Sequence, residues 1–89
     1  MPETIKQNSL EAQSPVAPSS GDFDALYRDC RDDLYAYIAY LVGDRVLAEE
    51  VTAVAFERAF RKRSMFRPGR GDLRGWLFSI ARNAAVDEL

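Results

Sequence analysis

The 89-residue sequence contains no histidine and a single cysteine, Cys30. It therefore lacks the commonest metal ligand and the base of Ser-His-Asp and Cys-His triads, and it cannot form an internal disulfide. No apolar run reaches the roughly 18 residues that span a bilayer, and no basic flank with an apolar core marks a secretion signal. These absences argue against an enzyme, a metal protein and a membrane-inserted protein, so we expect no cofactor and a cytoplasmic location.

Strand patterns are also lacking, whereas helical periodicity is frequent beyond the first 21 residues. Asp22, Asp44 and Asp72 stand where N-caps of helices belong, and Gly43 stands where a left-handed C-cap belongs. Three helices with short connections predict an all-α fold, a small antiparallel three-helix bundle. The expected helices cover about 23–42, 45–63 and 73–89.

The first 21 residues differ in composition from the rest. They are rich in Ser, Pro, Ala and Gln and lack helical periodicity, which predicts a disordered lead-in over 1–21. Residues 22–89 then form one small helical domain with a modest core. Cys30 falls on the apolar stripe of the first helix, so we interpret it as an inert core residue.

The net charge of −2 conceals two oppositely charged halves. Residues 22–56 hold three arginines against eight acidic residues, a net charge of −5, whereas residues 57–83 hold eight basic residues against two acidic ones, a net charge of +6. This asymmetry indicates an anionic partner for the second half and a different partner for the first.

The basic residues are concentrated around the loop "FRPGRGDLRG", residues 66–75. The planar fork of an arginine can donate two hydrogen bonds to one phosphate, and aromatic rings lie among these cations. Single-stranded nucleic acid suits such a surface, because cations follow its backbone and rings stack on its bases. The loop is not a nucleotide-cradling loop, since it lacks the Gly-Lys-Ser/Thr ending. The aromatic residues concerned are Phe60, Phe66 and Trp76.

Two other interpretations remain open from the residues alone. The chain could be a helical protein–protein interaction module whose basic loop binds an acidic partner. It could also be a bundle that binds RNA or duplex DNA, although the third helix offers only Arg82 and Asn83 as long or amide-bearing polar groups for reading a duplex.

Three segments carry a resemblance to a known family: "FDALYRDCRDDLYAYIAYLVGD", "LAEEVTAVAFERAFRK" and "GWLFSIARNAAVDEL". Together they resemble region 2 of the bacterial extracytoplasmic-function (ECF) sigma factors, in the sigma-70 family, over about residues 22–89. The most specific part is the run from Trp76 to Asn83, followed by Asp87.

The resemblance implies a transcription initiation domain that binds core RNA polymerase and recognises and melts the −10 promoter element. The loop and third helix would hold the non-template single strand, and the second helix would dock on the clamp coiled coil of the largest polymerase subunit. Anti-sigma proteins commonly mask this kind of domain, which adds one to the expected partners. The predicted DNA-binding residues are Arg61, Arg63, Phe66, Arg67, Arg70, Arg74, Trp76, Arg82 and Asn83. The predicted polymerase-binding residues are Ala48, Glu49, Glu50, Thr52, Ala53, Phe56 and Glu57.

The sequence departs from the family pattern at three positions of the second helix. The family usually has Asp at the positions of Leu47 and Glu50, and Gln at that of Ala53. Without the amide at Ala53, a polar contact to the clamp is lost. The family also continues beyond the position of Leu89 into a separate −35-binding domain, so we expect this chain to be a fragment of a longer factor.

Overall fold

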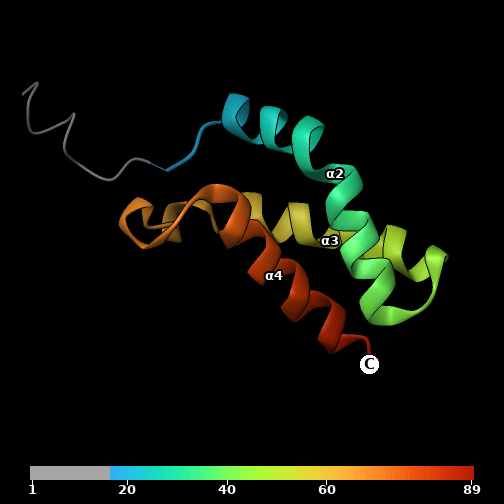
Figure 1. Ribbon diagram of the computed structural model, residues 1–89. Coiled ribbons are helices and arrows are strands. Elements are labelled where there is room, and N and C mark those ends of the chain that lie inside the picture. Colours follow the sequence, from blue (N-terminus) through green and yellow to red (C-terminus); the bar gives the residue numbers. More distant parts are fainter. Residues whose placement is uncertain (1–16) are drawn as a thin grey trace, which may run out of the picture.

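The computed structural model describes residues 17–89, which form three α-helices and two short 3₁₀ turns (Figure 1). The all-α prediction is confirmed, and no strand occurs in residues 17–89. Of the predicted lead-in, residues 1–16 lie outside the described part, whereas Ser20 and Gly21 already belong to the first helix. The elements are α2 (Ser20–Val42), α3 (Arg45–Arg61), η1 (Arg63–Met65), η2 (Pro68–Arg70) and α4 (Leu73–Asp87).

The start of α2 differs from the prediction, because Ser19 and not Asp22 is its N-cap. The Ser19 hydroxyl accepts a hydrogen bond from the Asp22 amide at 3.1 Å, and the Asp22 carboxylate accepts one from the Ser19 amide at 2.8 Å. This reciprocal capping box satisfies two amides that a helix start leaves unpaired. Asp22 is therefore the third residue of the helix, and α2 begins three residues earlier than predicted.

The other predicted caps are confirmed. Asp44 accepts a hydrogen bond from the Leu47 amide at 2.9 Å and so begins α3. Gly43 ends α2 with φ of 71°, a left-handed conformation that glycine adopts without a Cβ penalty. The predicted ends are less accurate, since α3 stops at Arg61 rather than at residue 63, and α4 stops at Asp87 rather than at residue 89.

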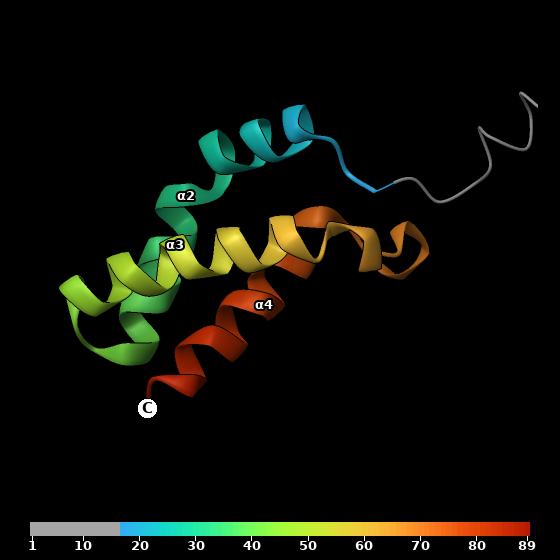
Figure 2. The same cartoon turned by 180° about the vertical axis from the view of Figure 1, so that it is seen from behind.

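Helix α3 runs in roughly the opposite direction to α2 and α4, and each helix packs against the other two (Figures 1 and 2). Leu34, Ile38 and Leu77 are fully buried where the helices meet. Burial of one such side chain stabilises the fold by about 1.5–3 kcal/mol. Cys30 is 3% exposed and unpaired, which confirms its prediction as a core residue. Small side chains let the helices approach closely, and those that are buried are Ala48, Ala55, Ala59, Ala81, Ala84 and Ala85.

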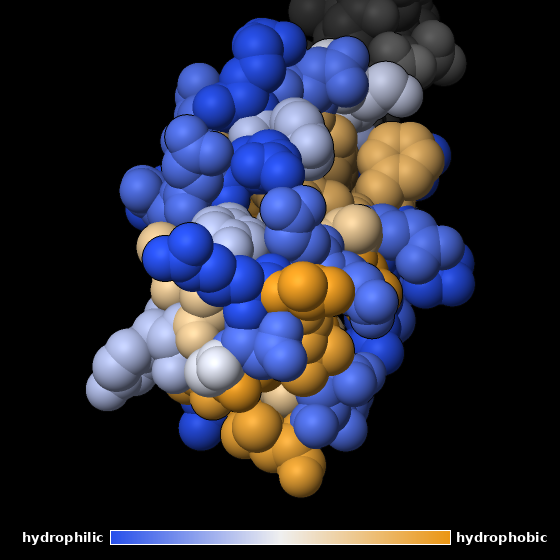
Figure 3. Space-filling model, turned by 90° about the vertical axis from the view of Figure 1, so that its right-hand side faces the viewer, coloured by the Kyte–Doolittle hydropathy of each residue, from blue (hydrophilic) through white to orange (hydrophobic). Residues whose placement is uncertain are grey.

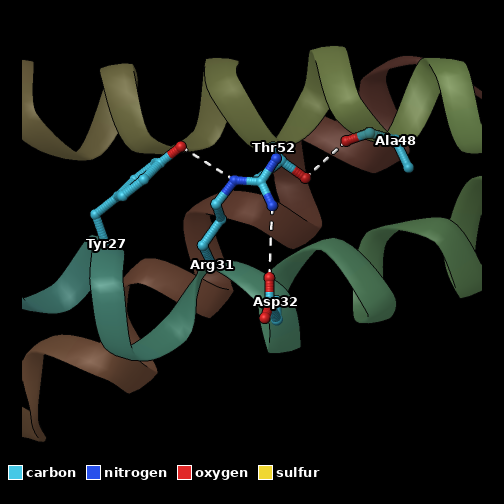
Figure 4. Close-up of polar contacts among 5 residues, drawn as sticks. All are labelled: Tyr27, Arg31, Asp32, Ala48 and Thr52. Atoms are coloured by element: carbon cyan, nitrogen blue, oxygen red, sulfur yellow. Dashed lines mark hydrogen bonds and ion pairs between the residues drawn. The ribbon is translucent and has the colours of Figure 1, made fainter.

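Polar contacts border the core between α2 and α3 (Figure 4). Thr52 is the only buried polar residue of the described part, and its hydroxyl donates to the Ala48 carbonyl at 2.6 Å. Arg31 donates from Nε to the Tyr27 hydroxyl at 3.0 Å and lies 3.5 Å from Asp32. The hydrogen bond to Tyr27 is the main reason why the pKa of Arg31 is raised.

None of the helices described for residues 17–89 is both long and apolar enough to cross a membrane.

Candidate nucleic-acid interface

The connection between α3 and α4 gathers basic residues at one end of the molecule. Lys62 closes α3, and Pro68 has no amide hydrogen with which to continue a helix. Gly71 has φ of 134°, where a side chain would be strained, and Asp72 then caps α4. Both ribbon views place this connection at the end opposite the α2–α3 turn (Figures 1 and 2).

The connection and the first turns of α4 surround a hollow of about 420 Å³. The rings of Phe66 and Trp76 lie beside each other there, with centroids 5.5 Å apart and planes inclined at 59°. Both residues are half-buried, so each ring is anchored and still presents apolar surface. Pockets for small ligands are typically about 300–1,000 Å³ in volume. The lining residues are Met65, Phe66, Arg67, Arg70, Gly71, Asp72, Gly75, Trp76 and Ser79.

Two polar side chains in the lining are engaged within α4 itself. The Asp72 carboxylate accepts a hydrogen bond from the Gly75 amide at 2.8 Å. The Ser79 hydroxyl donates to the Trp76 carbonyl at 2.7 Å. Both bonds hold the first turns of α4, so this wall of the hollow is a rigid helix start.

The two arginines of the lining differ in their contacts. Arg67 donates from Nη1 to the carbonyls of Ser64 at 3.2 Å and Phe66 at 3.3 Å, which holds it along the loop. Arg70 makes no side-chain hydrogen bond or ion pair with the residues described here, so its five donors are available to a ligand. A second hollow of about 590 Å³ continues around the loop and is lined by Met65, Arg67, Pro68, Gly69 and Arg70.

The structure therefore brings together four of the nine predicted DNA-binding residues: Phe66, Arg67, Arg70 and Trp76. Arg82 and Asn83 do not line the hollow, but both are exposed on α4. They follow Gly75 and Ser79 at helical spacing, so they continue the same face of α4 away from the hollow.

The remaining basic residues predicted to bind DNA contact other parts of the protein. Arg61 pairs with Glu57 at 3.7 Å. The guanidinium carbon of Arg63 lies 4.0 Å from the centroid of the Phe60 ring, and Nη1 donates to the Phe60 carbonyl at 2.8 Å. These two residues lie beside the hollow in the chain but do not line it.

Arg74 points to α2 instead of the hollow. Its Nη2 donates to the Asp33 carboxylate at 3.1 Å, and its Nη1 donates to Cys30 Sγ at 3.1 Å. The hydrogen bond to Asp33 is the first cause, and that to Cys30 the second, of a raised pKa at Arg74. Its guanidinium carbon also lies 4.8 Å from the centroid of the Phe78 ring.

The predicted polymerase-binding residues divide between the surface and the core. Ala48 and Thr52 are buried and present no surface to a partner, whereas Phe56 is half-buried against Tyr27, with ring centroids 4.9 Å apart. The others lie on one exposed stripe of α3, which also includes two apolar residues that sequence reasoning missed, Val46 and Val54. The exposed predicted residues are Glu49, Glu50, Ala53 and Glu57.

This stripe of α3 adjoins an open groove of about 470 Å³ near the α2–α3 turn. Tyr35, Arg45 and Val46 line it together with Glu49 and Glu50. Figure 3 shows this end of the molecule, where hydrophobic surface lies beside hydrophilic surface. The stripe and the loop hollow are thus formed by different elements and lie on separate parts of the molecule.

Sequence reasoning did not predict five residues of the hollow's lining: Met65, Gly71, Gly75 and Ser79, together with Asp72, which was predicted only as a helix cap. The spacing of Gly75 and Ser79, one turn apart and flanking Trp76, was a signal that could have identified the α4 wall. Within residues 17–89, no group of three or more His, Cys, Asp or Glu residues could hold a metal ion.

Comparisons with known proteins give one consistent result. The family described as Sigma-70 region 2 matches residues 26–89. The ECF RNA polymerase sigma factor BldN of Streptomyces coelicolor is 40% identical over 65 residues, which are 73% of this chain and 25% of that protein. The ECF RNA polymerase sigma factor SigX of Bacillus subtilis is 34% identical over 65 residues, 73% of this chain and 33% of that protein.

A third relative is the ECF RNA polymerase sigma factor SigL of Mycobacterium tuberculosis, 34% identical over 64 residues, 72% of this chain and 36% of that protein. The chain thus spans between a quarter and about a third of the length of these curated relatives. No solved structure matches it.

Proposed function

Because the chain belongs to the sigma-70 region 2 family, we propose that it is a transcription initiation domain that binds core RNA polymerase and holds the melted −10 element of a promoter. The observation that carries this proposal is the hollow formed by Phe66 and Trp76, with Arg67 and Arg70 at its edge. Aromatic faces beside unpaired cations are what an unstacked base and its phosphates require. The domain acts by binding and performs no covalent chemistry.

The energetics of holding an open strand fit this arrangement. Unstacking a base step costs a few kcal/mol, and stacking one base on an aromatic side chain returns about 1–3 kcal/mol. Arg67 and Arg70 add phosphate contacts, which release counterions from the DNA. Arg82 and Asn83 extend this surface along α4, so the bound strand runs from the loop over the exposed face of that helix. Capture of the non-template strand thereby offsets the cost of melting.

The exposed stripe of α3 is the proposed docking surface for core RNA polymerase. It presents Glu49, Glu50 and Glu57 with Val46 and Val54 among them, a mixture of acidic and apolar side chains. The proposed contact is the clamp coiled coil of the largest subunit. Because this stripe is separate from the loop, polymerase and DNA can be bound together in the bacterial cytoplasm. An anti-sigma protein that covers either surface would block initiation.

Titration of the domain into labelled single-stranded −10 DNA, followed by fluorescence anisotropy, tests the DNA-binding surface. We expect Arg70→Ala and Arg67→Ala each to weaken binding about 5- to 30-fold, because a hydrogen bond to a charged group contributes about 1.5–3 kcal/mol, less what solvent restores. Arg28→Ala is the matched control, since Arg28 is exposed on α2 and makes no side-chain hydrogen bond or ion pair within the described residues. Unchanged binding by both loop variants would reject the loop as the DNA site.

The same titration with RNA, duplex DNA and an acidic protein competitor distinguishes the alternative functions. The proposal requires that single-stranded −10 DNA competes best. Preference for the acidic competitor, with no binding of any nucleic acid, would instead identify an interaction module.

Pull-down of core RNA polymerase tests the α3 stripe. We expect Glu50→Arg to reduce capture at least about tenfold, because a reversed charge in an interface costs several kcal/mol. Asp24→Arg makes the same charge change on an exposed residue of α2 and should capture polymerase as the unaltered domain does. Equal capture by both variants would show that polymerase binds elsewhere.

A further inference from the structure

Arg74 belongs to the basic loop region by sequence, but its guanidinium is occupied by other parts of the protein. One end of its fork reaches Cys30 Sγ and the other reaches the Asp33 carboxylate, both at 3.1 Å. Cys30 and Asp33 lie one turn apart on α2, which presents both acceptors to a single planar fork. The two contacts join residues 44 and 41 positions apart in the chain.

The face of the same guanidinium is covered as well. It lies over the Phe78 ring, and Phe78 in turn packs against Tyr37 of α2 with ring centroids 5.5 Å apart. Two edges and one face of the Arg74 guanidinium are therefore in contact with other groups of the protein. A lysine ammonium could not make these contacts together, because it lacks the planar fork and the flat face. The side chain remains partly exposed, at 47%, so this contact works by fixing orientation and not by burial of charge.

The position of Arg74 in α4 connects this contact to the hollow. Arg74 is the second residue of α4, between the N-cap Asp72 and the residues Gly75 and Trp76, and all three of these neighbours line the hollow. Fixing Arg74 against α2 therefore fixes the helix turn from which the hollow's wall projects.

We propose that Arg74 is a positioning residue that holds the −10 strand site in shape from α2, and that it makes no DNA contact itself. This inference rests on the proposed function. Asp33 would then support DNA binding through its contact with Arg74, although it is acidic and α2 contributes no residue to the lining of the hollow.

The variant that separates the two roles of Arg74 is Asp33→Ala. Removing a negative charge strengthens DNA binding by electrostatics alone, and it would also release Arg74 to reach a phosphate. A positioning role predicts the opposite sign. We expect Asp33→Ala to weaken binding of single-stranded −10 DNA about three- to tenfold, the size of effect seen for residues that modulate a site without touching its ligand. Asp33→Glu, which keeps the carboxylate, should retain most of the affinity.

Asp32→Ala is the matched control, because Asp32 is the adjacent acidic residue and its one hydrogen bond or ion pair within residues 17–89 is with Arg31. It makes the same charge change but leaves Arg74 in place, so binding should stay unchanged or strengthen. The combined Asp33→Ala and Arg74→Ala variant should bind as weakly as Arg74→Ala alone, since Asp33 has no contact with residue 74 left to lose once the guanidinium is absent.

Salt dependence provides a second readout. Loss of a phosphate contact lowers the slope of log K against log salt by about 0.7 for a single strand. Arg74→Ala should weaken binding with the slope unchanged, whereas Arg70→Ala should reduce the slope. A reduced slope for Arg74→Ala, together with normal or tighter binding by Asp33→Ala, would overturn the inference and identify Arg74 as a phosphate ligand.

A measurement without DNA separates failure of this inference from failure of the proposed function. Trp76 is the only tryptophan, so quenching of its fluorescence by acrylamide reports on the hollow directly. Both Asp33→Ala and Arg74→Ala should increase quenching, and Asp32→Ala should not. If the unaltered domain bound no DNA, the proposed function would fail while this readout still decided the positioning role. Unchanged quenching in both variants would overturn it.

Discussion

At the scale of single residues, the arginines around the loop do different things although their sequence context is alike. Arg63 lies over an aromatic ring, Arg67 donates to loop carbonyls, and Arg74 bonds to α2. Of these four, only Arg70 makes no side-chain hydrogen bond, ion pair or cation–π contact within residues 17–89. Charge counting predicts an anionic partner for the region but does not predict the role of each residue. The inward turn of Arg74 depends on Cys30 and Asp33, which lie more than forty residues away in the chain.

Gly43 offers a residue-scale prediction about stability. Its φ of 71° is unfavourable for any residue with a Cβ, although no neighbouring atom lies within 4 Å of that position. Gly43→Ala should therefore lower the free energy of unfolding by about 1–2 kcal/mol through backbone strain alone. Urea unfolding followed by circular dichroism measures this.

Gly69→Ala is the control for this prediction, because Gly69 also has open space around it but no positive φ. It should be neutral or stabilise by up to about 1 kcal/mol. Equal losses in the two variants would mean that backbone conformation at Gly43 is not the cause.

At the scale of elements, the sequence predicts the three helices and two of their three N-caps. Asp44, Asp72 and Gly43 are recognisable because caps use few residue types at fixed positions. The start of α2 is misplaced because Ser19 and Asp22 are both cap-forming residues, and only the structure shows that they bond to each other. The hollow beside Trp76 was likewise not predictable in detail, since it depends on how the two 3₁₀ turns fold Phe66 back toward α4.

The capping box supplies an element-scale prediction. Ser19→Ala should cost about 1 kcal/mol in unfolding free energy, because the Asp22 amide loses its acceptor. Ser20→Ala alters the neighbouring exposed serine, whose side chain makes no hydrogen bond to any residue in 17–89, and it should leave stability unchanged. If α2 began at Phe23 with Asp22 as its cap, Ser19→Ala would be as silent as the control.

At the scale of the whole molecule, the opposite charges of the two halves are placed on separate surfaces. The exposed stripe of α3 carries Glu49, Glu50 and Glu57. The basic loop lies at the end of the molecule away from the α2–α3 turn (Figures 1 and 2). The halves share one apolar core, and the exposed ion pair between Arg74 and Asp33 also joins them. The ion pairs described within residues 17–89 number four, and every side chain in them is more than a third exposed.

This separation predicts that salt acts on binding and not on folding. Exposed ion pairs contribute little to stability, so raising salt from about 50 to 200 mM should leave the urea midpoint almost unchanged. Over the same range, three phosphate contacts to a single strand would weaken DNA binding about 10- to 20-fold. Parallel anisotropy titrations and urea unfolding curves at each salt concentration make the comparison. If the urea midpoint fell together with the loss of binding, salt would be acting by unfolding the domain. The salt dependence could then not be attributed to phosphate contacts of the basic loop.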